Sequence, residues 1–236
     1  MPGRNAGTGG RLPGDGRAAT VLRLLAAAAL AVVLATAAAA ISSAHAAVPA
    51  AMALGPSEQA DIARIESYLN SVTTVSSRFL QRSSTGQLAG GDFFLRRPGK
   101  MRIEYQPPVP VLIVADGRFL IYHDTQLQQV TYLPLGSTPA GILLAESISL
   151  SGAELTITEF DREPGALRVT VVRTRSPHEG SLTLVFSDSP LALRKWSVVD
   201  AQGTVTDVSL IDARFDEALD PDLFRFRDPR FFREWP

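Results

Sequence analysis

The sequence predicts a mainly β fold of the α+β class. We expect a curled antiparallel sheet of about eleven strands that forms an open half-barrel, with short helices as a lid. Two observations lead to this expectation. Much of the chain after residue 70 alternates apolar and polar residues with period two, which is typical of strands with one buried face. Turn residues separate these runs at short intervals, and a sheet of more than about ten twisted strands has to curl.

The first 46 residues have the features of a secretory signal peptide. Four arginines precede an uncharged, alanine-rich run at residues 24–40, and Ala44-His45-Ala46 suits a cleavage site. A retained membrane anchor is the alternative, but the run is at the short end of what a bilayer span requires. We therefore assign residues 1–46 to a cleaved signal peptide and residues 47–236 to one exported domain.

Composition argues against several classes of protein. The chain contains no cysteine, so disulfides, thiolate metal sites, a thiol nucleophile and lipid modification at a cysteine are excluded. Residues 1–46 contribute four arginines and one aspartate, so without them the net charge of −1 becomes −4. A chain with this charge has no basic field to attract nucleic acid, and we expect no such partner.

The first element after the signal peptide should be an amphipathic helix over residues 57–70. Ser57 is a suitable N-cap, and acidic residues follow it in the first turn. Ile62, Ile65 and Leu69 recur at helical spacing and should form the buried face.

Strands follow this helix. In residues 101–105, for example, three apolar side chains alternate with Arg102 and Glu104. Asp116-Gly117 lies between two apolar runs and is a strong hairpin signal. We expect strands at residues 74–83, 88–97, 100–106, 110–116, 118–124, 127–133, 154–161, 166–174, 181–187, 193–200 and 204–214.

One break interrupts this succession of strands. Thr138-Pro139 precedes a segment at residues 140–147 that should contain a short helix, because proline is favoured at the first helical position. Pro221 can open another short helix near the C-terminus, within a stretch rich in phenylalanine at residues 220–236.

Residues that could carry out catalysis are few. His123 and His178 have no metal-ligand spacing, and the chain has no G-x-S-x-G nucleophile motif. Glu104, Asp116 and Asp124 could face one another as paired carboxylates, but surface carboxylates that balance arginines are the simpler interpretation. We therefore expect no enzyme activity, no catalytic residue, no metal and no cofactor.

Five segments, in order, resemble the outer-membrane lipoprotein carrier (LolA) family. GGDFFLRRPGKMRIEYQPP at residues 90–108 is similar to a family pattern of a strand, a basic residue, Arg-Pro, a turn and an aromatic-ended strand before proline. LIVADGRFLIYHDTQLQQVTYLPL at residues 112–135 matches the family's next hairpin. The other three segments are SSRFLQ at 76–81, TPAGILL at 138–144 and LDPDLFRFRDP at 219–229. In contrast, the tail RFFREWP is more aromatic than the end we associate with the family.

This resemblance implies a function and its site. It implies a monomeric periplasmic chaperone of a Gram-negative bacterium that receives acylated lipoproteins from an inner-membrane ABC transporter. The chaperone passes them to an outer-membrane receptor or to the membrane, without a cofactor. Arg97 is implied to lock the lid through hydrogen bonds. With the strand faces above, the expected lipid-binding cavity residues are Phe79, Phe93, Leu95, Met101, Ile103, Tyr105, Ile113, Phe119, Ile121, Leu143, Leu144, Leu155 and Ile157.

Other interpretations remain open at this point. The apolar strand faces could pack as an ordinary filled core. A periplasmic lipid- or glycolipid-binding or sensor protein could have the same fold. The membrane-anchored receptor of the same fold (LolB type) needs a lipidated cysteine, which this chain lacks. A hydrolase acting on an amphipathic substrate would need a constellation of residues that the sequence does not display.

Overall fold

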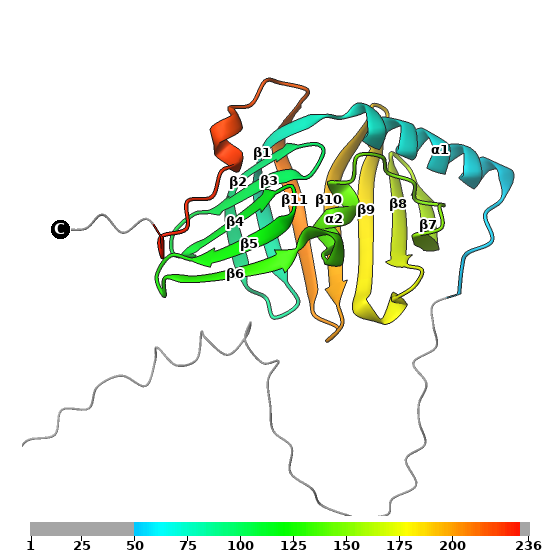
Figure 1. Cartoon of the computed structure of the whole chain (residues 1–236). Coiled ribbons are helices and arrows are strands. Elements are labelled where there is room, and N and C mark those ends of the chain that lie inside the picture. Colours follow the sequence, from blue (N-terminus) through cyan, green and yellow to red (C-terminus); the bar gives the residue numbers. More distant parts are fainter. Residues whose placement is uncertain (1–49, 232–236) are drawn as a thin grey trace, which may run out of the picture. The chain divides into compact units, whose positions relative to one another are not determined.

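The computed structural model describes residues 50–231, so the expected signal peptide and the last five residues of the aromatic tail lie outside the described range. The described residues form one eleven-stranded antiparallel sheet that is not closed into a barrel, together with a few short helices (Figure 1). The predicted fold class is confirmed. Within residues 50–231, none of the helices has the length and apolarity that a membrane crossing requires.

Every expected strand is present, and its ends differ from the prediction by at most two residues. This agreement follows from the period-two pattern and the turn residues that bound it. The strands are β1 (Thr74–Ser83), β2 (Leu88–Arg96), β3 (Lys100–Tyr105), β4 (Val111–Asp116), β5 (Phe119–Asp124), β6 (Gln129–Pro134), β7 (Leu155–Glu163), β8 (Ala166–Arg173), β9 (Gly180–Asp188), β10 (Leu191–Asp200) and β11 (Val205–Phe215).

The strand order is β6-β5-β4-β3-β2-β1-β11-β10-β9-β8-β7. The first six strands therefore run outward from the centre of the sheet to one edge, and the last five run inward from the other edge. The two halves join where β1 pairs with β11, as in the pair Phe79 and Leu210. Residues 135–154 have to connect the two edges, and they contain η2 (Leu135–Ser137) and α2 (Pro139–Leu143).

The N-terminal helix α1 (Pro56–Ser71) begins one residue earlier than expected. Its N-cap is Gly55 rather than Ser57, because the Glu58 carboxylate accepts a hydrogen bond from the Gly55 amide at 2.7 Å and a proline occupies the first turn. The buried face is the predicted one. Tyr68 from this helix packs edge-on against Phe186 of β9, with ring centroids 6.0 Å apart.

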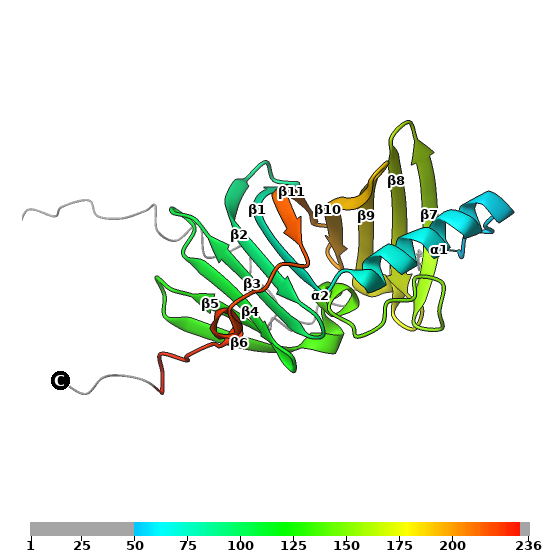
Figure 2. The same ribbon diagram turned by 90° about the horizontal axis from the view of Figure 1, so that it is seen from above.

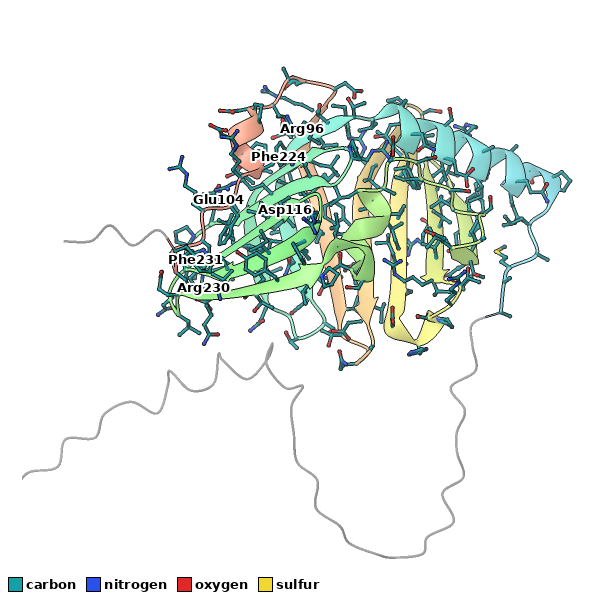
Figure 3. All side chains as sticks on the ribbon, in the orientation of Figure 1. Arg96, Glu104, Asp116, Phe224, Arg230 and Phe231 are labelled. Atoms are coloured by element: carbon teal, nitrogen blue, oxygen red, sulfur yellow. The ribbon has the colours of Figure 1, made fainter. Side chains whose placement is uncertain are left out.

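The two faces of the sheet are covered by different parts of the chain. Figure 2 shows α1 and α2 on the same side of the curved sheet, which we call the inner face. The outer face of β2–β5 is covered by the C-terminal segment that includes η4 (Pro221–Phe224). There the guanidinium carbon of Arg96 lies 5.0 Å from the centre of the Phe224 ring (Figure 3), and Phe224, Val114 and Ile121 are buried.

Candidate functional site

A small apolar cavity lies between the helices and the inner face of the sheet. Its volume is about 40 Å³, and carbon-rich side chains from α1, the sheet and residues 135–154 surround it. We call α1 and residues 135–154 together the lid. The cavity is lined by Tyr68, Leu69, Val72, Val75, Phe93, Leu95, Arg97, Leu143, Ile148, Leu193, Trp196, Leu210 and Phe215.

Three of the residues expected at a lipid site line this cavity, namely Phe93, Leu95 and Leu143, and Arg97 lies at its wall. Most of the others belong to the surrounding apolar cluster on the same face of the sheet without reaching the cavity. These are Phe79, Met101, Ile103, Tyr105, Ile113, Leu144, Leu155 and Ile157.

The structure places Phe119 and Ile121 on the outer face, away from the cavity where we expected them. Ile121 pairs with Val114, and Ile113 pairs with Tyr122, so Ile121 and Ile113 point to opposite faces. The Phe119 ring packs edge-on against Tyr132, with centroids 5.9 Å apart. The C-terminal segment covers this outer surface, where Phe226 packs against Tyr132, and apolar side chains therefore occur on both faces of β5.

Several cavity residues come from β10 and β11, where strict alternation fails. A β-bulge lies between Leu193 and Lys195, and it shifts the register by one residue. Leu193 and Trp196 consequently share the inner face although three positions separate them. A period-two pattern cannot show this, because the bulge changes which residues face inward.

Arg97 follows β2 and makes hydrogen bonds to both parts of the lid. Its Nη1 donates to the Ala145 carbonyl at 3.4 Å, and its other nitrogens donate to the carbonyls of Leu69 and Val72 at the end of α1. Burial lowers the pKa of Arg97, and the charge of nearby Asp216 acts in the opposite direction. The guanidinium thus connects the sheet to both parts of the lid.

Further hydrogen bonds hold the two parts of the lid to each other. The Asn70 amide exchanges two bonds with the backbone of Ile148, each 2.8 Å long. The Glu66 carboxylate accepts from the backbone amides of Leu150 at 2.6 Å and Ser151 at 3.2 Å. Because α1 and residues 148–151 are joined at several points, we expect them to move together.

The size of the cavity shows that the lid is closed. A volume of about 40 Å³ has room for only a few water molecules, since a cavity of roughly 10–15 Å³ already holds one. A long acyl chain needs several times more room. Such a ligand can enter only if α1 or residues 135–154 move away from the sheet.

The potentially reactive side chains do not form a metal cluster. Among residues 50–231, no group of three or more His, Asp or Glu side chains is arranged to hold a metal ion. His123 is instead buried on the outer side of β5, where its ring lies 5.5 Å from that of Phe226.

Known proteins are similar to most of this chain. Residues 70–227 match the family model for the outer membrane lipoprotein carrier protein LolA. An outer-membrane lipoprotein carrier protein of Legionella pneumophila (strain Paris) is 31% identical over a 176-residue alignment that covers 70% of this chain and 85% of that protein. One from Halorhodospira halophila is 30% identical over a 192-residue alignment that covers 75% of this chain and 86% of that protein.

The solved structures include a LolA superfamily protein from Nitrosomonas europaea, which aligns with 70% of this chain and 97% of its own at 11% identity and a TM-score of 0.43. The sequence matches are the decisive ones, because they extend over most of the chain at about the 30% level. They confirm the resemblance expected from the ordered segments, and the chain belongs to the outer membrane lipoprotein carrier protein LolA family.

Proposed function

We propose that this protein is a periplasmic chaperone that binds the acyl chains of lipoproteins. It receives them from an inner-membrane ABC transporter and delivers them to a receptor in the outer membrane or to the membrane itself. In this proposal residues 1–46 are a cleaved signal peptide, and residues 47–236 are a monomeric lipid-binding domain. The protein makes and breaks no covalent bond and uses no cofactor.

One observation carries this proposal: an apolar cavity lies under a lid that Arg97 fastens by hydrogen bonds to backbone carbonyls. Apolar packing alone would give a permanently closed core. A lid that is held partly by hydrogen bonds can open when a ligand replaces the apolar contacts between the lid and the sheet. The inner-face residues predicted above then extend the binding surface beyond the small closed cavity.

The energetics suit a carrier that must also release its cargo. Burial of one methylene group contributes about 0.8 kcal/mol, so one long acyl chain contributes on the order of 10 kcal/mol. A protein that gained all of this energy would hold its cargo too tightly. Lid bonds that stabilise the empty, closed state offset part of the binding energy and thereby favour release.

Native mass spectrometry of the mature protein tests this proposal. The protein is purified from periplasm with and without a detergent wash, and then offered a synthetic triacylated lipopeptide. The same peptide without acyl chains is the control. We expect a one-to-one complex with the acylated peptide only. A protein that takes up no lipopeptide would overturn the proposal, and a co-purified phospholipid or glycolipid with no lipopeptide uptake would favour the lipid-binding alternative.

A further inference from the structure

We infer that Arg173 is a second residue that holds the lid on the sheet. Arg97 and Arg173 belong to opposite halves of the sheet. This inference rests on the proposed function, because a fastening matters only if the lid opens for cargo. The lid segment at residues 135–154 runs from β6 at one edge of the sheet to β7 at the other edge. Its position across the open side of the sheet is visible in Figure 1.

Arg173 occupies a position where the strand pattern calls for an apolar residue. Leu167, Val169 and Val171 are fully buried on the inner face of β8. Arg173 continues that face, since it pairs with Leu155 as Val171 pairs with Ile157. A charged residue at the end of such a row is costly to bury unless it has a partner.

The partner of Arg173 belongs to the lid. Its Nη2 donates to the carbonyl oxygen of Thr138 at 2.9 Å. Thr138 is buried and caps α2, because its Oγ1 accepts from the Gly141 amide at 3.3 Å and donates to the Leu135 carbonyl at 2.8 Å. A bond to this carbonyl therefore holds the beginning of α2.

The segment around Thr138 is compact enough to transmit this restraint. A Cβ at Gly141 would lie 2.5 Å from the Leu135 carbonyl oxygen, so only glycine permits this close approach. Residues 135–141 consequently behave as one small unit. When the Arg173 bond fixes Thr138, it also fixes the first turn of α2.

The end of α2 is held by the other half of the sheet. Arg97, which follows β2, donates to Ala145, and the amide of Gly99 donates to the Leu144 carbonyl at 2.9 Å. In the strand order β2 and β8 lie on opposite sides of the central β1–β11 pair. The two arginines thus join the halves of the sheet through α2, and loss of the Arg173 bond removes the tie between β8 and the beginning of α2.

The test compares Arg173→Met with Arg173→Lys and Arg168→Met in the full mature protein. The lysine ammonium group can still donate one hydrogen bond to the Thr138 carbonyl oxygen. Arg168 lies on the outer face of the same strand, where it is half-exposed and 3.9 Å from Glu163, so it is the matched control. Hydrogen exchange of the amides in residues 139–144 is measured in the empty protein. Dissociation of a fluorescent triacylated lipopeptide is measured in the loaded protein.

We expect Arg173→Met to accelerate exchange in residues 139–144 and to slow lipopeptide dissociation, each on the order of tenfold, as the loss of one charge-assisted hydrogen bond predicts. Arg173→Lys should restore most of both values, and Arg168→Met should change neither. Unchanged exchange in Arg173→Met, or failure of Arg173→Lys to restore it, would overturn the inference. If Arg173→Met does not fold, Arg173→Gln, which is polar but too short to reach Thr138, carries the same expectation.

A failure of the proposed function and a failure of the Arg173 inference give different results in these measurements. If wild-type protein binds no lipopeptide, the carrier proposal fails, whereas the exchange measurement still reports whether Arg173 restrains α2.

Discussion

The guanidinium of Arg97 reaches the carbonyl oxygen of Val72 through two nitrogens, Nε at 3.0 Å and Nη2 at 2.7 Å. Val72 is the C-cap of α1, and Leu69 in the last turn also accepts from Arg97. The last carbonyls of a helix have no partner within it, and the negative end of the helix dipole favours a cation. Since the last turn of α1 contains no basic residue, Arg97 from the sheet supplies this charge.

Replacement of Arg97 should therefore hinder the release of cargo. Arg97→Leu leaves the carbonyls of Leu69 and Val72 without their donor and destabilises the closed state. We expect lipopeptide transfer to acceptor liposomes to slow by roughly tenfold or more, because hydrogen bonds to charged groups contribute about 1.5–3 kcal/mol each. Arg96→Leu, on the outer face, is the control and should transfer normally. Transfer at the wild-type rate by Arg97→Leu would exclude a locking role.

A second prediction concerns the attachment of α1 to β7. The buried carboxylate of Asp61 pairs with Arg64 at 2.9 Å and with Arg162 of β7. Asp61→Asn removes the charge that both arginines share, and should lower the free energy of unfolding by about 1–3 kcal/mol. Asp212→Asn breaks an exposed pair with Arg78 and should cost less than about 1 kcal/mol. Urea denaturation measures both, and equal losses would contradict this assignment.

A third prediction concerns alkaline pH. Burial raises the pKa of Tyr105 to about 12, while its hydroxyl donates to Oε1 of Gln81 at 2.6 Å. The folded protein therefore favours the protonated phenol. The resulting stability is fully present below pH 10 and is lost as the pH rises through about 12. In Tyr105→Phe the unfolding free energy should fall less over this interval than in wild type, and phenolate absorbance should lose its last step. An unchanged pH dependence would refute the assignment.

The sheet could be predicted from the sequence almost completely. Alternation and turn residues are local signals, and in this chain they agree with the strand pairing. The Asp116-Gly117 signal gives a hairpin whose loop is two residues long, because Asp116 ends β4 and Phe119 begins β5. That loop length also sets the register between β4 and β5, so it could have placed Ile121 opposite Val114.

The cavity could be predicted only in part, for two physical reasons. The outer face of β4 and β5 is buried by a segment that begins almost one hundred residues later in the chain. Both faces of these strands therefore have apolar residues, and the sequence pattern does not indicate which face is the inner one. The bulge before Lys195 depends on pairing with β9, so alternation in β10 alone does not show that Trp196 points inward. The family resemblance at residues 90–108 points to Arg97, whereas Arg173 is identified only by its hydrogen bond to Thr138 in the folded structure.

A fourth prediction concerns the close packing of β1, β2 and β3. Gly91 pairs with both Phe79 and Tyr105, whose rings meet edge-on across it at 5.2 Å. A Cβ at Gly91 would overlap the Glu104 carbonyl and lie 2.9 Å from Cε1 of Phe79. We expect Gly91→Ala to cost roughly 3 kcal/mol of unfolding free energy or more.

The control for this substitution is Gly136→Ala. A Cβ at Gly136 would have no atom within 4 Å, and its backbone is not left-handed. Its unfolding free energy should remain within about 0.5 kcal/mol of wild type. A Gly91→Ala protein as stable as Gly136→Ala would show that β2 and β3 can separate locally, contrary to the packing described above.

The last prediction separates the two faces of the sheet. Leu95 and Ile121 are both buried aliphatic residues, but Leu95 lines the inner cavity and Ile121 lies under the C-terminal segment. Substitution by glutamine places an amide of similar size at either position, and each should destabilise the fold because a buried amide without partners costs about 1–3 kcal/mol. Only Leu95→Gln places that amide against the acyl chain. Its lipopeptide affinity should fall about tenfold or more, whereas Ile121→Gln should bind like wild type at a temperature where both variants are folded. Equal losses of affinity would mean that the acyl chain does not bind on the inner face, since stability alone would then explain both results.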